Sequence, residues 1–447
     1  MKTKIFTKIA KKIKPFWAKY WQMILLISTV TLFWSPIFHN NTFFSDDWAF
    51  INQFTNHGFQ AGYLFRTYNE HFLPFFKVFF YIAFSIFGMN FPPYMAIALS
   101  VHVLNTVMFY LLAKLIFKGR KKLPLLLAVA FGVSNVYFEI IRWFTTTQIS
   151  LCFFFMLCAL YFLHLYVIKK DKKFYYISIA SSILSPLNFA LGSFTFIFLV
   201  AYYFLIIKRS FKPSRLKEDA LLLLPYLIGW LIYIAVYYFT TYELIKTRAM
   251  LLDQRHLYNL NILNLIGYFI LCFIAFFTRI LGIGGFIPNV WSLLIAVIFL
   301  ANMLFLAYFL LMYFLLNEKK KRVRLIGDRG LFWFFLIGVC ISYGVLAVGR
   351  PSGGGVAYFI WGRYHLFPAF FMYLLFGSMA ISVRTILGKI FDKKKVMTFF
   401  YFLFVLYLIM QMGLIWKKSD SSMRIGALMG PEKVACVQTT ALRSTSL

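Results

Sequence analysis

Acidic residues are scarce in this chain. Its 447 residues include 14 Asp and Glu against 46 Lys and Arg, and charged residues make up only 13% of the total. Soluble domains carry about 25% charged residues, so this composition excludes an ordinary soluble fold. The shortage also makes each carboxylate informative, because ionised side chains are costly near hydrocarbon.

Cysteine is scarce as well. Four of the five cysteines (Cys152, Cys158, Cys272 and Cys340) lie in apolar runs, and Cys436 lies near the C-terminal end. None has the spacing of metal ligands. We therefore interpret them as small hydrophobic residues within helices.

Apolar residues dominate instead. The chain is 62% hydrophobic and 21% aromatic, and continuous apolar runs of about 18 residues or more recur along it. Only helices and closed barrels span a bilayer, and continuous rather than alternating runs indicate helices. The sequence thus predicts an all-α polytopic membrane protein.

The net charge of +32 comes largely from short basic clusters between the apolar runs. They lie in residues 1–19, 114–122, 169–173, 208–217, 319–329 and 384–395. Basic loops of this kind stay in the cytoplasm and are attracted to anionic membrane lipids. Topology therefore explains the charge, and we expect no nucleic-acid partner.

With those clusters inside, the chain is expected to cross the membrane about 11 times, with the N-terminus in the cytoplasm. The expected spans are 21–38, 94–117, 123–138, 146–168, 174–190, 191–207, 220–240, 289–316, 331–348, 365–387 and 396–416. The pair 174–190 and 191–207 is barely long enough for two crossings, so a miscount there is the alternative.

Three regions follow from this topology. Residues 1–20 form a basic cytoplasmic N-terminus before an uncleaved signal anchor, 21–416 form the membrane domain, and 417–447 form a polar tail expected to be disordered. The outer loops are 39–93, 139–145, 241–288 and 349–364. Two apolar stretches, 75–88 and 263–283, would upset the charge rule as crossings, so they are expected as embedded or interfacial helices on the outer face.

No carboxylate lies in the middle of an expected span. The outer ones are Asp46, Asp47, Glu70, Glu139, Glu243 and Asp253. Ion-coupled transporters tend to place ionisable groups near the midplane, so this distribution favours an enzyme at the outer boundary. A lipid-linked glycan flippase and a non-catalytic envelope assembly subunit are the alternatives.

Three of these carboxylates lie beside expected spans. Asp46 and Asp47 follow the first span, and Glu139 ends the third, just before Arg142. They converge if these spans pack together. Carboxylates in an apolar wall have raised pKa values and serve as general bases. With His71 they could instead hold a divalent cation such as Mg²⁺ or Mn²⁺; a solvated loop is the plain alternative.

Two further groups suggest substrate contacts. Arg350 and Arg363 flank a glycine-rich loop; arginine binds phosphate through its planar fork, and glycine permits close backbone approach. The alternative is a connector whose arginines meet lipid headgroups. His102 and Asn105 lie one helical turn apart, either lining the same cavity or forming a satisfied polar pair within the membrane.

The order of these blocks resembles the GT-C superfamily of membrane glycosyltransferases, in particular the branch of protein O-mannosyltransferases and lipid A aminoarabinose transferases with its bacterial relatives. The similar blocks are Asp46-Asp47 after a single span, Phe87-Gly88-Met89-Asn90, His102-x-x-Asn105, Asn135 to Trp143, and Gly362-Arg363-Tyr364-His365-Leu366-Phe367-Pro368. Each block is short, and together they cover roughly residues 21–370.

The resemblance implies a GT-C-like bundle with its active site on the outer face, in a bacterial plasma membrane. It implies transfer of a sugar from a polyprenyl-phosphate donor to a protein, lipid or envelope-glycan acceptor. Asp47, or else Asp46, would be the catalytic base, Glu139 the second acid, and Arg363 would lie near the phosphate. The further substrate-binding candidates are Arg350, Glu70, His71, His102, Arg142 and Tyr364.

The chain departs from the family pattern at two places. Asn69-Glu70-His71-Phe72-Leu73-Pro74 stands where a Tyr-Arg-Pro block is expected, and Pro186-Leu187 stands where some relatives have Lys-Glu. Part of the donor or acceptor site must therefore differ.

Overall fold

The computed structural model describes residues 20–39, 42–68, 71–209, 213–251, 275–276, 279–280, 329–349 and 362–428. This part is almost entirely helical and contains no strand; Tyr68 and His71 form one isolated antiparallel bridge. The all-α prediction is confirmed to that extent.

The helices of the described part are η1 Ser35–His39, α2 Asp46–His57, α3 Ala61–Phe65, α4 Pro74–Phe87, α5 Pro92–Ile116, α6 Leu123–Gly132, η2 Asn135–Tyr137, α7 Phe138–Arg142, η3 Phe144–Thr146, α8 Thr147–Lys169, α9 Lys172–Leu184, η4 Ala190–Phe194, α10 Thr195–Tyr202, η5 Tyr203–Lys208, η6 Pro213–Arg215, α11 Leu216–Leu251, α15 Arg329–Gly349, η7 Gly362–His365, α17 Leu366–Ile390 and α18 Lys393–Leu428.

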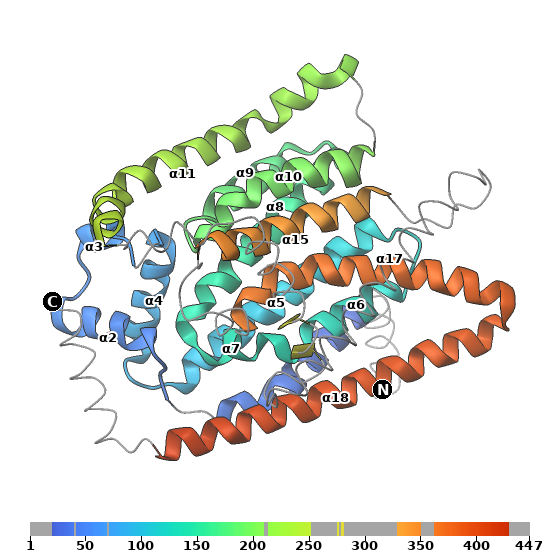
Figure 1. Ribbon diagram of the computed structural model, residues 1–447, viewed down its shortest axis with the longest axis horizontal. Helices are drawn as coiled ribbons and strands as arrows, with labels where there is room; N and C mark the ends of the chain where they lie inside the picture. Colours follow the sequence, from blue (N-terminus) through green and yellow to red (C-terminus); the bar gives the residue numbers. More distant parts are fainter. Residues whose placement is uncertain are drawn as a thin grey trace, which may run out of the picture.

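Eight segments of the described part are long and apolar enough to cross a membrane. They are Tyr20–His39, Pro92–Ile116, Leu123–Arg142, Phe144–Lys169, Ala190–Lys208, Leu216–Tyr242, Gly362–Ile381 and Lys394–Asp420. Each coincides with an expected span, and together they fit a multi-pass membrane protein. Figure 1 shows most of the long helices lying side by side, with α11 and α18 along opposite flanks.

Three expected spans have no counterpart among these eight. The stretch 174–190 falls on α9, which has only 13 residues and ends before the turn at Pro186. The stretch 331–348 falls on α15, a helix of 21 residues that includes the apolar segment Gly330–Val345. The stretch 289–316 lies outside the described residues, as does most of 263–283.

The third span is not one continuous helix. α6 ends at Gly132, and the chain continues through η2 into the short α7. The indole nitrogen of Trp34 (Nε1) and the imidazole nitrogen Nε2 of His102 each lie 2.8 Å from the Gly132 carbonyl oxygen. The Tyr407 hydroxyl donates to the Ala130 carbonyl at 2.9 Å. Backbone carbonyls freed inside a membrane need such partners, so these side chains stabilise the break.

Gly132 is also a point of close approach between α6 and its neighbours, the first span and α5. A Cβ atom at this position would lie 2.6 Å from Val30 Cγ2 and 2.7 Å from Thr106 Cγ2. The glycine thus permits the first and third spans to pack together, as the sequence required for the carboxylates to converge.

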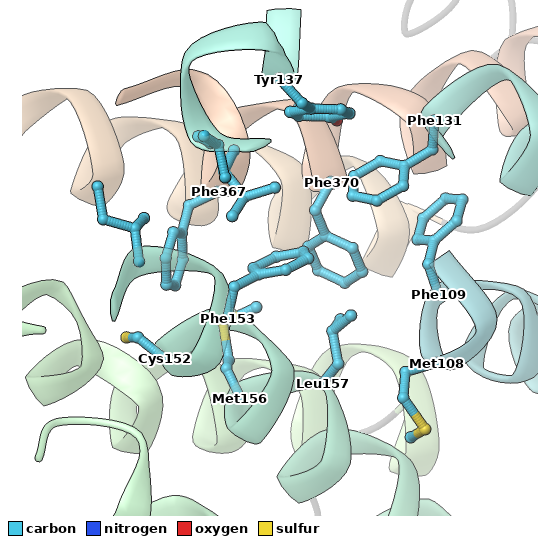
Figure 2. Packing of buried hydrophobic residues seen from close by; sticks show 14 of the residues in the cluster. Met108, Phe109, Phe131, Tyr137, Cys152, Phe153, Met156, Leu157, Phe367 and Phe370 are labelled. Carbon is cyan, nitrogen blue, oxygen red and sulfur yellow. The ribbon is translucent and has the colours of Figure 1, made fainter. Parts of the chain in front are cut away.

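Aromatic rings fill the interior between α6, α8 and α17. Phe153 packs edge-on against Phe367 and Phe370, with ring centroids 5.2 and 5.8 Å apart, and Phe131 and Tyr137 lie on the same cluster (Figure 2). Edge-to-face contacts at these distances are favourable beyond the area they bury. They fix the start of α17, and with it the preceding η7, against the third and fourth spans.

Three short helices, α2, α3 and α4, lie together at one end of the bundle (Figure 1). α4 covers the stretch 75–88 almost residue for residue, as a helix of 14 residues. The buried ammonium of Lys77 donates to the carbonyl oxygens of Tyr63, at 2.6 Å, and Arg66, and burial lowers the pKa of Lys77 to about 8. Lys77 therefore satisfies the C-terminal end of α3.

The last helix is longer than the sequence suggested. α18 runs to Leu428, so the first part of the stretch interpreted as a disordered tail, from Lys417 onwards, is helical. The remainder, 429–447, lies outside the described residues.

The indole donor at the break of the third span gives a direct test. Trp34→Phe keeps the aromatic ring but removes the hydrogen bond to Gly132, which should destabilise the protein by about 1–3 kcal/mol and lower its Tm in detergent. Trp21→Phe is the matched control, because Trp21 is 41% exposed on the same span. An equal Tm for Trp34→Phe and Trp21→Phe would show that the break does not depend on this bond.

Candidate functional site

Asp47 joins the loop after the first span to η3, at the start of the fourth span. Its Oδ2 accepts a hydrogen bond from the Phe44 amide at 3.0 Å, and its Oδ1 accepts from the Thr145 amide at 2.6 Å and the Thr145 hydroxyl at 2.5 Å. The Asp47 side chain is fully buried at the first turn of α2. Asp47 therefore ties α2 to the segment that directly follows Trp143.

Burial raises the pKa of Asp47 to about 7. The hydrogen bonds from Thr145 and Phe44 oppose this shift, because they favour the ionised form, and the neighbouring charge of Asp46 adds slightly to it. Asp46 itself is only partly buried and accepts a hydrogen bond from the Tyr68 hydroxyl. The two adjacent carboxylates thus have different environments, one closed and one partly open.

Trp143 contacts residues from two other segments, the one that precedes Asp46-Asp47 and the one that begins at Gly362. Its ring packs edge-on against Phe44 at 5.2 Å, and the Arg363 guanidinium lies 4.4 Å from the Trp143 ring centroid. The Arg142 guanidinium lies 5.4 Å from the centroid of Phe44. We call Phe44, Arg142, Trp143 and Arg363 the Trp143 cluster. Its members come from three segments far apart in the sequence, and cation–π contacts hold them together.

Gly362 brings Arg363 to this position through close backbone contact. A Cβ atom at Gly362 would lie 2.3 Å from the Val136 carbonyl oxygen and 2.9 Å from Arg279 Nη1. Only a glycine lets η7 lie this close to η2. The position of the predicted block that begins with Gly362 and Arg363 therefore depends on η2, the segment that follows the break in the third span.

Glu139 lies at the start of α7 in an ion pair with Arg279, whose Nη2 is 3.0 Å from Glu139 Oε1. The Glu139 side chain is 29% exposed and that of Arg279 is 11% exposed. Glu139 is thus accessible, as a group that meets a substrate must be, and the pair leaves the second carboxylate oxygen of Glu139 open.

A polar network behind Glu139 was not foreseen from the sequence. Asn135 Nδ2 donates to Gln411 Oε1 at 2.8 Å and to the Arg279 carbonyl at 2.9 Å, and Lys418 Nζ donates to Asn135 Oδ1 at 2.6 Å. Gln411 Nε2 donates to the Ile280 carbonyl at 2.8 Å. We call these five residues the Asn135 network.

Three cationic side chains therefore interact with Glu139, namely Arg142, Arg279 and Lys418. A fourth, Arg363, lies over the ring of nearby Trp143. Two buried donors beside them, Trp143 Nε1 and Arg279 Nε, have no acceptor among the described residues. Arginine forks and unpaired donors next to a carboxylate form an arrangement that binds anionic groups such as phosphate.

The other substrate-binding candidates lie in different surroundings. His102 is fully buried against Trp34 and Tyr137 and contacts Gly132, and Asn105 Nδ2 donates to the Ser150 carbonyl at 3.0 Å. Each side chain thus makes one contact inside the bundle, while His102 Nδ1 and Asn105 Oδ1 have no hydrogen-bond partner among the described residues; both interpretations of the pair therefore stay open. The His71 ring packs on Phe189 at 4.7 Å. Tyr364 accepts a hydrogen bond from Arg363 at 3.3 Å.

Glu70 and Arg350 lie outside the described residues. Among the residues that are described, no three His, Cys, Asp or Glu side chains are grouped as metal ligands. Asp46, Asp47, Glu139 and His71 therefore do not assemble into the divalent-cation site considered from the sequence.

Signals for the missed residues are present in the sequence. Gln411 is an amide within an apolar span, and Lys417-Lys418 places basic charge at the end of the span where the charge rule does not expect it. Intramembrane polar groups usually mark a site or a packing contact. Arg279 offered no such signal, because it lies in a stretch of uncertain topology.

Comparisons with protein-family models, with curated proteins and with solved structures gave no match. The resemblance to GT-C transferases therefore depends on the sequence blocks, and the geometry of the site has to carry any functional argument.

Gly362 offers a stability test of the close contact with η2. Gly362→Ala forces η7 away from Val136, and overpacking of this kind costs about 1–3 kcal/mol, so the Tm should fall. Gly413→Ala is the control, because a Cβ atom there meets nothing within 4 Å. If Gly362→Ala melted at the temperature of the wild type, the contact with Val136 would not constrain η7.

The raised pKa of Asp47 predicts a pH dependence. The folded protein keeps a proton to about pH 7, whereas an unfolded chain releases it near its ordinary value of 3.8. The contribution of Asp47 to stability therefore falls as pH rises between these two values and is level above the upper one. The Tm of the wild type minus that of Asp47→Asn should decrease from about pH 5 to about pH 7 and then level off. A difference independent of pH would contradict the shift.

Proposed function

We propose that this protein is a membrane glycosyltransferase of GT-C type, which transfers a sugar from a polyprenyl-phosphate donor to an acceptor. The observation that carries this proposal is the meeting of three distant blocks at the Trp143 cluster. Phe44, next to Asp47, contacts Trp143, and Arg363 lies over the same ring. A general base, a second acid and phosphate-binding cations are what this reaction needs in one place.

In the proposed reaction, a carboxylate takes the proton from an acceptor hydroxyl or amine. The acceptor atom attacks the anomeric carbon as the bond between that carbon and the phosphate oxygen breaks. The phosphate leaves with the bonding electrons, and its charge is stabilised by Arg142, Arg279 and Arg363. Direct displacement inverts the anomeric carbon and needs no covalent intermediate.

The environments of the two aspartates suggest separate roles. Asp47 has a pKa suited to a base, but it is fully buried and already accepts three hydrogen bonds. Asp46 is partly open beside it. We therefore propose Asp46 as the catalytic base and Asp47 as the positioning residue that holds the loop, while Asp47 as the base itself stays a prediction.

The donor phosphate is proposed to lie between Arg363 and the Arg279–Glu139 pair, with Arg142 close by. Arg363 packs on the Trp143 ring and Arg279 forms an ion pair with Glu139. Trp143 Nε1 is a further donor without an acceptor among the described residues. Tyr364 and His71 remain candidates for the sugar or the acceptor, and so do Glu70 and Arg350.

The finer topology belongs to the same proposal. We propose about 11 crossings of a bacterial plasma membrane, a cytoplasmic N-terminus, and an outer face that carries the site and the embedded helices. The contact between the Phe75 amide and the Leu187 carbonyl, at 3.2 Å, supports one detail. It joins α4 to the turn after α9, as expected if both lie at the outer surface.

Substitution of the two aspartates tests the catalytic assignment. In membranes supplied with a labelled polyprenyl-phosphate sugar, Asp46→Asn should reduce kcat by about 10²–10⁴-fold with little change in Tm. Asp47→Asn should lower activity and Tm together, because an amide cannot accept from both Phe44 and Thr145 in the same way. Asp171→Asn is the control, since Asp171 is an exposed carboxylate outside the site.

Unchanged sugar transfer in both Asp46→Asn and Asp47→Asn would remove the catalytic assignment. Passage of the labelled lipid across the bilayer without bond breakage would instead identify a flippase.

A further inference from the structure

One face of α18 carries buried polar side chains, although most of the helix within the expected span is apolar. Its exposed side carries large hydrophobic residues such as Phe402, Ile409 and Met412. Gln411 is fully buried, and Lys418 lies two turns further along on the same face. Figure 1 shows α18 running along the flank of the bundle. These polar side chains therefore have a purpose other than contact with lipid.

Both side chains converge on the break in the third span. Gln411 Oε1 accepts from the Asn135 backbone amide at 2.7 Å and from Asn135 Nδ2 at 2.8 Å. Lys418 Nζ donates to both Asn135 Oδ1 and the Asn135 carbonyl, at 2.6 and 3.3 Å. The start of η2 is thus held on both sides by the last helix.

The same residues hold the segment that carries Arg279. Asn135 Nδ2 donates to the Arg279 carbonyl, and Gln411 Nε2 donates to the carbonyl of Ile280. Arg279 then reaches Glu139 at 3.0 Å. Buried amide groups are costly unless bonded, and here each amide group of Gln411 and Asn135 has a named partner, so the orientation of the network is fixed.

We propose that α18 is a positioning element for the site. Gln411 and Lys418 hold Asn135 and the Arg279 segment in register, so that Arg279 meets Glu139 beside the Trp143 cluster. They are positioning residues, acting through Asn135 rather than on a reacting atom. The consequence for turnover depends on the proposed glycosyltransferase function; the coupling between α18 and the Arg279–Glu139 pair does not.

A double-mutant cycle on the Tm of the purified protein tests the coupling without any substrate. The variants are Gln411→Leu, Glu139→Gln and their combination. If Gln411 places Arg279, then Glu139→Gln should lower the Tm clearly less in the Gln411→Leu background than in the wild type. Equal Tm losses in the two backgrounds would overturn the proposal.

Two further variants serve as the control for the cycle and as a substitute for Gln411→Leu. Met412→Ala replaces an exposed residue of α18, so its combination with Glu139→Gln should be additive. Should Gln411→Leu fail to fold, Lys418→Met takes its place in the cycle, because it removes the contact with Asn135 and leaves the amide pair intact. Additivity for Lys418→Met would then overturn the proposal in the same way.

The functional arm uses the labelled polyprenyl-phosphate sugar. Lys418→Met should lower kcat at least about tenfold, a loss equal to about 1.4 kcal/mol, with a smaller change in KM, and Lys418→Arg should restore most of it. The control is Lys417→Met, a neighbouring exposed lysine. Wild-type kcat in Lys418→Met would overturn the positioning role. If the wild-type protein transfers no sugar, the proposed glycosyltransferase function is wrong. The Tm cycle then remains a separate test of the coupling between α18 and the Arg279–Glu139 pair.

Discussion

The site depends on how the protein compensates for a helix that stops inside the membrane. When α6 ends at Gly132, its last carbonyls lose their partners in the helix, and lipid offers none. Trp34, His102 and Tyr407, from three other spans, supply donors to the Ala130 and Gly132 carbonyls. Without these partners, the chain would be expected to continue as one helix, and Glu139 would point elsewhere.

Several of the polar residues buried in the membrane region can be understood through this break. Asn135, the first residue after it, collects hydrogen bonds from Gln411 and Lys418 and passes them to the Arg279 segment. The break therefore exchanges the regular backbone bonds of one span for side-chain bonds from distant parts of the chain. This exchange gives the site its fixed geometry, because irregular backbone in a membrane persists only where it is fully satisfied.

Composition and charge alone were enough to predict the all-helical membrane fold, and eight expected spans coincide with apolar helices of spanning length. The contacts of Phe44 and Arg363 with Trp143 bring together segments that were expected at the same ends of neighbouring spans, whereas a common cavity for Asp47, Glu139 and Arg363 stays a prediction. The hydropathy pattern failed at α9, where apolar residues continue past Leu184 although the helix ends. Averaged hydropathy cannot detect such an end, which depends on backbone contacts such as the close approach of Gly192 to Ser185.

The role assigned to His102 shows what contacts add to a sequence pattern. An imidazole and an amide one turn apart in a span fit a substrate cavity and an internal polar pair equally well. The Gly132 carbonyl, 30 residues away in sequence, contacts Nε2 of His102 and gives the imidazole a structural role, while its Nδ1 has no partner among the described residues. Lys418 is a second case. Its polar surroundings in the sequence placed it in a C-terminal tail to which no function was attached. In the topology expected from the sequence, Lys418 departs from the charge rule, and its ammonium donates to Asn135 Oδ1. Departures from the charge rule are therefore as informative as agreement with it, since a local contact has to account for each one.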